Sequence, residues 1–290
     1  MTASAQALSF VAADYDAGAL SKAGAVTTET SSTAMAATGN IASVVYSETS
    51  ADVIVGYTSW QPAMAGANVV YIGGSYKVGD KLGFALSFTS VGYPKYEVFE
   101  DFGPSQGAFK PSDMQLNIGA AYRVLPYVSA GVNLGYASSA LAEDVTYGGF
   151  RADVFLMSKL LDFKIALGVS DLGTSIESAS GVSFSLPTAL TLGLGYEKEY
   201  EDIHKVDLAL DADFYWEGAF ATSVGAEYIF KDMISCSAGY RYGGKSIIPS
   251  YASLGLGGCV RGISLELAYI LPLAEVPMSN TLSIAVGYSF

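Results

Sequence analysis

The chain has 290 residues, of which 51% are hydrophobic and 15% charged, and no run reaches the roughly 18 consecutive apolar residues that a membrane helix needs. A formal net charge of -13 argues against a nucleic-acid-binding protein, because phosphate groups require a basic surface. A large soluble β-sandwich and a transmembrane β-barrel remain. The 32 Gly, 20 Tyr and 14 Phe favour the barrel, whose lumen takes small residues and whose rims take aromatic ones.

Residues 1–50 differ from the rest of the chain, because they are rich in Ala, Ser, Thr and Gly and contain Lys22 as their only basic residue. A disordered leader and a plug inside the barrel both fit this composition, and the small residues favour the plug. Met1 to Ala7 is too short for a full secretory signal, so we expect a trimmed chain. We therefore divide the chain into an N-terminal plug or lumenal segment, 1–50, and a transmembrane β-barrel, 51–290.

After about residue 50, apolar residues alternate with small or polar ones between turn signals, which predicts strands with one lipid-facing side. In the stretch 111–123, for example, Met114 and Leu116 point outward, while Gln115 and Asn117 point inward. We expect fourteen strands near 52–60, 66–77, 80–92, 111–123, 127–139, 147–159, 161–172, 188–198, 204–216, 218–230, 232–243, 250–260, 261–271 and 280–290. The predicted fold is all-β, a 14-stranded antiparallel transmembrane barrel of the bacterial outer membrane.

Loop lengths and aromatic residues give this barrel an orientation. The long links 93–110, 173–187 and 272–279 all follow odd-numbered strands, and long loops belong outside the cell. Two aromatic girdles follow from the same assignment. Tyr76, Tyr122, Tyr196, Tyr228 and Tyr288 lie near the periplasmic rim, and Trp60, Phe88, Tyr136, Trp216 and Tyr269 near the opposite rim.

The long outer link that begins at Tyr93 interleaves aromatic with acidic residues. Such aromatic side chains are costly to leave in water, so the loop either folds over the barrel mouth or meets a partner protein. The residues expected to contact a partner are Tyr93, Tyr96, Phe99, Phe102 and Phe109.

Charged residues also fall on the inward phase of the strands. They are Arg123, Arg151, Asp153, Lys164, Asp207, Asp211, Asp213, Glu227, Arg241 and Glu266. They could form a charged gate or a cation site. The simpler interpretation, which we favour, is that they neutralise one another inside the lumen, because unpaired buried charges are costly.

Catalytic and metal sites find little support. The stretch Gly239 to Ser246 fits the phosphate-loop pattern, but another strand follows it where that loop needs a helix. The single His204 lies in a turn without a second histidine. Cys236 and Cys259 fall on opposite faces, which predicts two free thiols. We expect no enzymatic activity, no metal, and no cofactor other than bound lipid or detergent.

In the last strand, Leu282 to Phe290, every even position is large and apolar and every odd position is small. The aromatic end resembles the C-terminal strand of bacterial outer-membrane barrels, which implies that Tyr288 and Phe290 act as the assembly signal.

Three motifs resemble the PorV/PorQ family of Bacteroidetes outer-membrane proteins, relatives of the fatty-acid transporter FadL. They are the small-residue segment from Asp16 to Ala25, the stretch from Gly107 to Tyr122, and Val169-Ser170-Asp171-Leu172-Gly173 followed by Leu186-Pro187. The chain departs from the family at 38–43, where an Asn-Pro-Ala step is usual.

This resemblance implies an accessory or shuttle subunit of type IX protein secretion, or of surface-protein attachment, that acts through its extracellular loops. Its partners would be outer-membrane lipid and other outer-membrane or secreted proteins, such as the type IX translocon, and no nucleic acid. The FadL relationship implies instead a transporter of hydrophobic small molecules, which should show a continuous apolar cavity and a kinked wall strand. A structural subunit of a larger outer-membrane complex is the third alternative.

Overall fold

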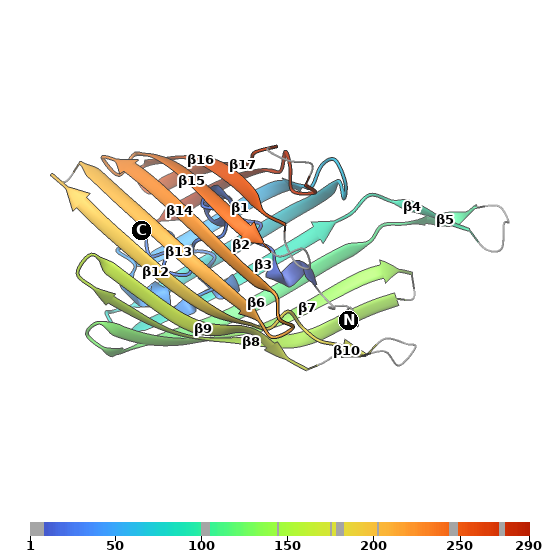
Figure 1. Ribbon diagram of the computed structural model, residues 1–290, viewed down its shortest axis with the longest axis horizontal. Coiled ribbons are helices and arrows are strands. Elements are labelled where there is room, and N and C mark those ends of the chain that lie inside the picture. Colours follow the sequence, from blue (N-terminus) through green and yellow to red (C-terminus); the bar gives the residue numbers. More distant parts are fainter. Residues whose placement is uncertain are drawn as a thin grey trace.

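The computed structural model describes residues 9–99, 105–143, 145–174, 176–177, 183–201, 203–243, 249–272 and 276–290. Its main feature is a closed antiparallel barrel, in which β18 pairs with β1 (Figure 1). The barrel strands are β1 (Ala51–Trp60), β2 (Ala67–Val78), β3 (Leu82–Gly92), β6 (Ser112–Leu125), β7 (Val128–Ala142), β8 (Val145–Leu160), β9 (Phe163–Gly173), β12 (Ala189–Tyr200), β13 (His204–Tyr215), β14 (Phe220–Phe230), β15 (Ile234–Gly243), β16 (Tyr251–Val260), β17 (Ile263–Ile270) and β18 (Leu282–Ser289). All the predicted strands are confirmed, with ends shifted by a few residues.

Two short hairpins extend the loops at one end of the barrel. They are β4 (Tyr96–Phe99) with β5 (Ser105–Phe109), and β10 (Ile176–Glu177) with β11 (Ser183–Phe184). The β4–β5 hairpin stands well beyond the barrel (Figure 1). These hairpins lie inside two of the long links that were expected outside the cell, so we call this end the mouth. The opposite end carries short turns such as the one between β2 and β3, and we call it the periplasmic end after the orientation expected from the loop lengths.

The outer surface of the barrel is apolar. Side chains such as Ile72, Leu116 and Leu256 are exposed by 53%, 51% and 62%, while their neighbours along each strand face the lumen. An apolar belt of this extent is unstable in water and requires lipid. Single-chain barrels with an even number of strands are typical of the bacterial outer membrane, which is where this barrel belongs.

Trp60 was placed in the outer aromatic girdle, and that prediction is wrong. On β1 the outward positions are Val53, Val55 and Tyr57, so an even-numbered residue points inward. Trp60 is only 6% exposed, and its ring packs edge-on against Tyr15 with centroids 4.7 Å apart. It is a lumenal residue at the mouth.

The structure also places the two cysteines, His204 and part of the phosphate-loop pattern. Cys236 and Cys259 are free, as expected. His204 begins β13, and its Nδ1 lies 2.7 Å from the hydroxyl of Tyr228 at the periplasmic rim. The first half of the phosphate-loop pattern, Gly239 to Gly243, belongs to strand β15, and residues 244–248 lie outside the described part of the chain.

The C-terminal residue is held by backbone hydrogen bonds at the point where the barrel closes. The backbone N–H groups of Ser50 and Ala51 both donate to the carbonyl oxygen of Phe290, at 2.8 and 2.9 Å. The rings of Tyr288 and Phe290 lie 5.5 Å apart on the outer face. Their role as an assembly signal stays a prediction.

Candidate functional site

Residues 9–50, the N-terminal segment, lie inside the barrel and run from the mouth to the periplasmic end (Figure 1). Their helices are short: η1 (Ser9–Ala12), α1 (Ala17–Ser21), η2 (Ala36–Thr38) and η3 (Ile41–Tyr46). No helix among the described residues is long and apolar enough to cross a membrane. The segment packs with α1 against β16 and β17 and with η3 against β6, β3 and β7.

Small residues allow this close packing. A Cβ atom added to Gly239 of the wall would lie 2.3 Å from the backbone of Lys22, and one added to Gly131 would lie 2.9 Å from the backbone nitrogen of Ala42. No side chain fits there. The glycine-rich wall therefore lets the segment's backbone approach to contact distance, which explains part of the unusual composition.

Wall side chains then satisfy the segment's backbone. Thr58 donates to the carbonyl of Tyr15 at 2.6 Å, and Ser129 donates to the carbonyl of Ala42 at 2.7 Å. In the other direction, the N–H of Ala17 donates to the hydroxyl of Tyr71 at 2.9 Å. These contacts hold irregular backbone in a lumen where an unpaired polar group would be costly.

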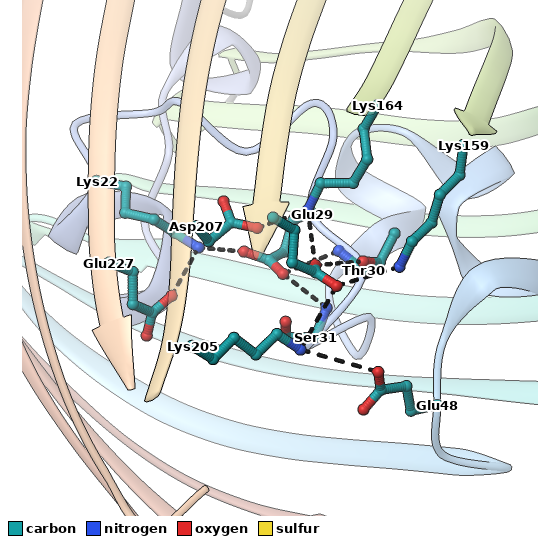
Figure 2. Close-up of polar contacts among 11 residues, drawn as sticks. Lys22, Glu29, Thr30, Ser31, Glu48, Lys159, Lys164, Lys205, Asp207 and Glu227 are labelled. Carbon is teal, nitrogen blue, oxygen red and sulfur yellow. Dashed lines mark hydrogen bonds and ion pairs between the residues drawn. The ribbon is translucent and has the colours of Figure 1, made fainter. Parts of the chain in front are cut away.

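A charged network joins the segment to the wall near the middle of the lumen. Figure 2 shows Lys22 and Glu29 of the segment beside Glu227, Asp207 and Lys164 of the wall. Lys22 pairs with Glu29 and, at 3.1 Å, with Glu227. Lys164 binds Asp207 at 2.6 Å, so alternating charges compensate one another across the network.

Glu197 of β12 extends this network toward the periplasm. Its carboxylate receives Lys164 at 2.9 Å, Lys159 at 3.3 Å and Lys205 at 3.6 Å. Three lysines around one carboxylate leave a positive balance there. This local excess of positive charge lies beside the carboxylates of Glu29 and Asp207 and compensates their negative charge.

The electrostatics of the segment reflect this pairing. Burial alone would raise the pKa of Glu29, but the ammonium groups of Lys22 and Lys164 outweigh it and hold the pKa well below its ordinary value. The N–H groups of Thr30 and Ser31 also donate to this carboxylate, at 2.8 and 2.7 Å. Glu29 is therefore ionised at any physiological pH and is a fixed anchor of the segment.

Strand β9 carries an irregularity on the mouth side. Opposite β8, the register shifts between Ala152 and Val154, so Ser170 and Asp171 occupy the place of one residue. Asp171 has a φ of 55°, a conformation that Asp tolerates better than most residues. Its N–H donates to Asp153 at 2.8 Å, and its carboxylate binds Arg151 at 2.9 Å.

All the inward charges named from sequence occupy the lumen. The structure pairs Arg151 with Asp153 at 2.8 Å and Arg241 with Asp213 at 3.2 Å. Other members meet the N-terminal segment: Asp211 accepts from the N–H of Thr27 at 2.8 Å, and Arg123 donates to the carbonyl of Val45. Glu266 lies beside Gly18 of α1.

Sequence reasoning missed several members of this network. Glu197 and Lys205 lie on the inward phase of predicted strands, so alternation could have found them. Asp171 lies inward only because the bulge shifts the phase by one residue, and no alternation rule shows that. Lys22 and Glu29 lie outside any strand, and their partners could not be read from the sequence.

An apolar cluster lies at the mouth, and we call it the mouth cluster. The N-terminal segment contributes Phe10, Val11 and Tyr15 to it, all at most 8% exposed. The wall and loops contribute buried Trp60, Val69, Val91, Leu186, Tyr251, Ile270 and Met278, with Tyr93 and Tyr147 packed against them. The lumen is thus apolar at its outer end and charged in its middle.

The aromatic residues of the outer loop are divided between two places. Tyr93 packs against the mouth cluster, and its hydroxyl donates to Asp113 at 2.6 Å. Tyr96 and Phe109 lie on the β4–β5 hairpin with ring centroids 5.9 Å apart. The side chain of Phe99 and the whole of Phe102 lie outside what the structure describes, and the partner-binding role of all five stays a prediction.

Comparison with known proteins identifies the architecture. No family model and no curated protein matches the chain. Among solved structures, the Pseudomonas putida toluene transporter TodX has 14% sequence identity, covers 95% of this chain and 97% of its own, and gives a TM-score of 0.65. The Ralstonia pickettii toluene transporter TbuX has 12% identity, covers 95% and 97%, and gives 0.63. The chain has the FadL-like barrel fold.

A FadL homologue of Pseudomonas aeruginosa agrees with this, at 12% identity, 95% and 98% coverage and a TM-score of 0.57. Identities this low show the FadL-like fold alone. These neighbours are described as toluene transporters or as a FadL homologue and not as enzymes, in line with the expectation of no enzymatic activity. Nothing in the comparisons supports the PorV/PorQ family specifically.

Proposed function

We propose that this chain is an outer-membrane channel for small hydrophobic molecules, which enter through the mouth cluster. The observation that carries the proposal is the placement of that cluster at the outer end of the lumen, where Phe10, Val11 and Tyr15 of the N-terminal segment pack among aromatic and aliphatic residues of the wall. Ligand sites are typically apolar, concave and placed in barrel mouths. The FadL-like fold, shared with two toluene transporters, adds support.

A hydrophobic molecule would replace the segment's side chains against the same wall. Burying a side chain of the size of Phe10 is worth about 2–3 kcal/mol, and a small aromatic molecule in the same place gains a similar amount. The free energy of replacing the side chain of Phe10 by a small aromatic molecule is therefore close to zero. The ion pair of Lys22 with Glu227 of the wall, deeper in the lumen, then limits how far the segment moves.

Trp60 makes this proposal testable. Of the two tryptophans in the chain, Trp60 is buried against Tyr15 and Trp216 is exposed on the outer surface. In a Trp216→Phe variant, titration with a monoaromatic hydrocarbon should change the Trp60 emission saturably, while a sugar of similar size should not. Absence of a saturable response would count against a binding site at the mouth.

The second candidate function is attachment of secreted or surface proteins through the β4–β5 hairpin. The hairpin projects beyond the barrel (Figure 1), and Tyr96 and Val98 are exposed by 41% and 36%. Deleting residues 95–108 should abolish partner binding and leave a folded, heat-modifiable barrel. Unchanged co-purification of exported or translocon proteins would remove this role, and with it the support for a type IX or structural-subunit function.

A further inference from the structure

Two cavities lie beside the N-terminal segment. The periplasmic cavity, of about 390 Å³, lies between the segment and strands β14 to β18 and reaches Met233, Cys259 and Ser289 at the short-turn end. The mouth-side cavity, of about 140 Å³, is lined on the wall by Thr89, Gln115, Thr191 and Arg241 among others.

One thin part of the segment separates the two cavities. Asp14, Asp16, Met35, Thr38, Gly39 and Asn40 line both of them. Asn40 is fixed, because its Nδ2 donates to the carbonyl of Thr27 at 2.8 Å and its Oδ1 accepts from Ala42 at 3.0 Å. Gly39 leaves space, because a Cβ atom added there would meet nothing within 4 Å.

The mouth-side cavity requires water. Gln115 and Arg241 are only 3% and 4% exposed, and both line this cavity. Gln115 Oε1 and Arg241 Nε have no hydrogen-bond partner among the described residues. Buried polar atoms are almost always paired with protein or water, and a cavity of this size holds several water molecules at about 30 Å³ each.

Carboxylates dominate the lining. The periplasmic cavity is lined by Glu29, Glu48, Glu227 and Glu266, against the basic side chains of Lys22 and Lys205. On the mouth side, Asp14, Asp171 and Asp213 face Arg241. A cleft lined mostly by one sign of charge concentrates ions of the other sign.

We propose that the two cavities are parts of one aqueous path beside the N-terminal segment, which passes water and small cations in preference to anions, with Gly39 at the place where the two cavities meet. The path follows the polar side of the lumen and is independent of the proposed transport of hydrophobic molecules. A barrel of this kind would carry two kinds of solute along two surfaces of the same segment.

The native cysteines allow a first test. Cys259 lines the periplasmic cavity, whereas Cys236 faces outward into lipid. In a Cys236→Ser variant reconstituted in bilayers, a cationic methanethiosulfonate reagent should modify Cys259 at least about tenfold faster than an anionic reagent of the same size. In the matched Cys259→Ser variant, neither reagent should react. Equal rates, or a faster anionic reagent, would overturn the preference for cations.

The path itself is tested by conductance across planar bilayers. The wild-type barrel should show a small conductance whose reversal potential in a KCl gradient indicates cation preference. Gly39→Arg should abolish this conductance or shift the reversal potential toward that of chloride, whereas Gly39→Ala should leave it unchanged. Both variants must first show a heat-modifiable folded band. A folded wild-type barrel without conductance, or a Gly39→Arg variant with unchanged selectivity, would overturn the proposal.

Discussion

At the scale of single residues, Lys22 is the main electrostatic link between the N-terminal segment and the wall. Lys22→Met removes the ammonium group that pairs with both Glu29 and Glu227, and removing one partner of a buried pair costs about 3 kcal/mol. We therefore expect the segment in the folded barrel to become much more sensitive to protease. The matched control is Lys198→Met, whose pair with Asp162 at 2.6 Å is solvent-exposed and should change nothing. If the segment were equally resistant to protease in both variants, Lys22 would not be its main electrostatic link to the wall.

Asp14 should make docking of the segment depend on pH. Burial raises its pKa to about 6, against the lowering effect of Arg241 and together with the raising effects of Asp16 and Asp213. Because the folded pKa lies above the ordinary value, this contribution to docking is complete below about pH 4 and is lost as pH rises through 6. The loss is about 3 kcal/mol. Trp60 emission in Trp216→Phe should report looser packing at pH 8 than at pH 5, and Asp14→Asn should flatten that change.

At the scale of elements, the bulge in β9 places Asp171 in a left-handed backbone conformation and turns its side chain into the lumen. Asp171 combines a φ of 55° with an ion pair to Arg151. Asp171→Asn keeps a residue that tolerates this backbone, whereas Asp171→Val adds a β-branched side chain where it is strained. We expect Val to cost about 1–3 kcal/mol more than Asn. The check is the temperature at which the folded band disappears in semi-native electrophoresis, and equal temperatures would show that the backbone conformation is unimportant.

Most of the strands could be predicted from the sequence, because a membrane barrel imposes a two-residue period on every strand. Three features were nevertheless not predicted. Trp60 follows the inward phase of β1 although it was assigned to the aromatic girdle, Asp171 leaves the alternation at a bulge, and Val69 and Ile270 keep the inward phase but are apolar. Each depends on contacts with the N-terminal segment or on a local register shift, and neither leaves a periodic signal.

At the scale of the whole molecule, the lumen is graded from an apolar mouth to a charged middle, with one segment touching both. Composition indicated a narrow lumen rich in small residues, but not this gradient, because it arises from residues far apart in the chain such as Tyr15, Tyr93 and Tyr251. In the two proposals above, hydrophobic molecules use the apolar mouth, and water and cations use the polar side of the lumen. The ion pair of Lys22 with Glu227 holds the N-terminal segment to the wall in the middle of the lumen.

The most direct test of hydrophobic transport is uptake of a radiolabelled monoaromatic hydrocarbon, at limiting concentration, by cells whose outer membrane lacks other hydrophobic channels. Expression of the wild-type barrel should raise the initial rate at least about tenfold. Leu186→Arg places a charge in the mouth cluster and should return the rate to background while the folded band remains. An initial rate that is the same with and without the wild-type barrel would contradict the proposed function.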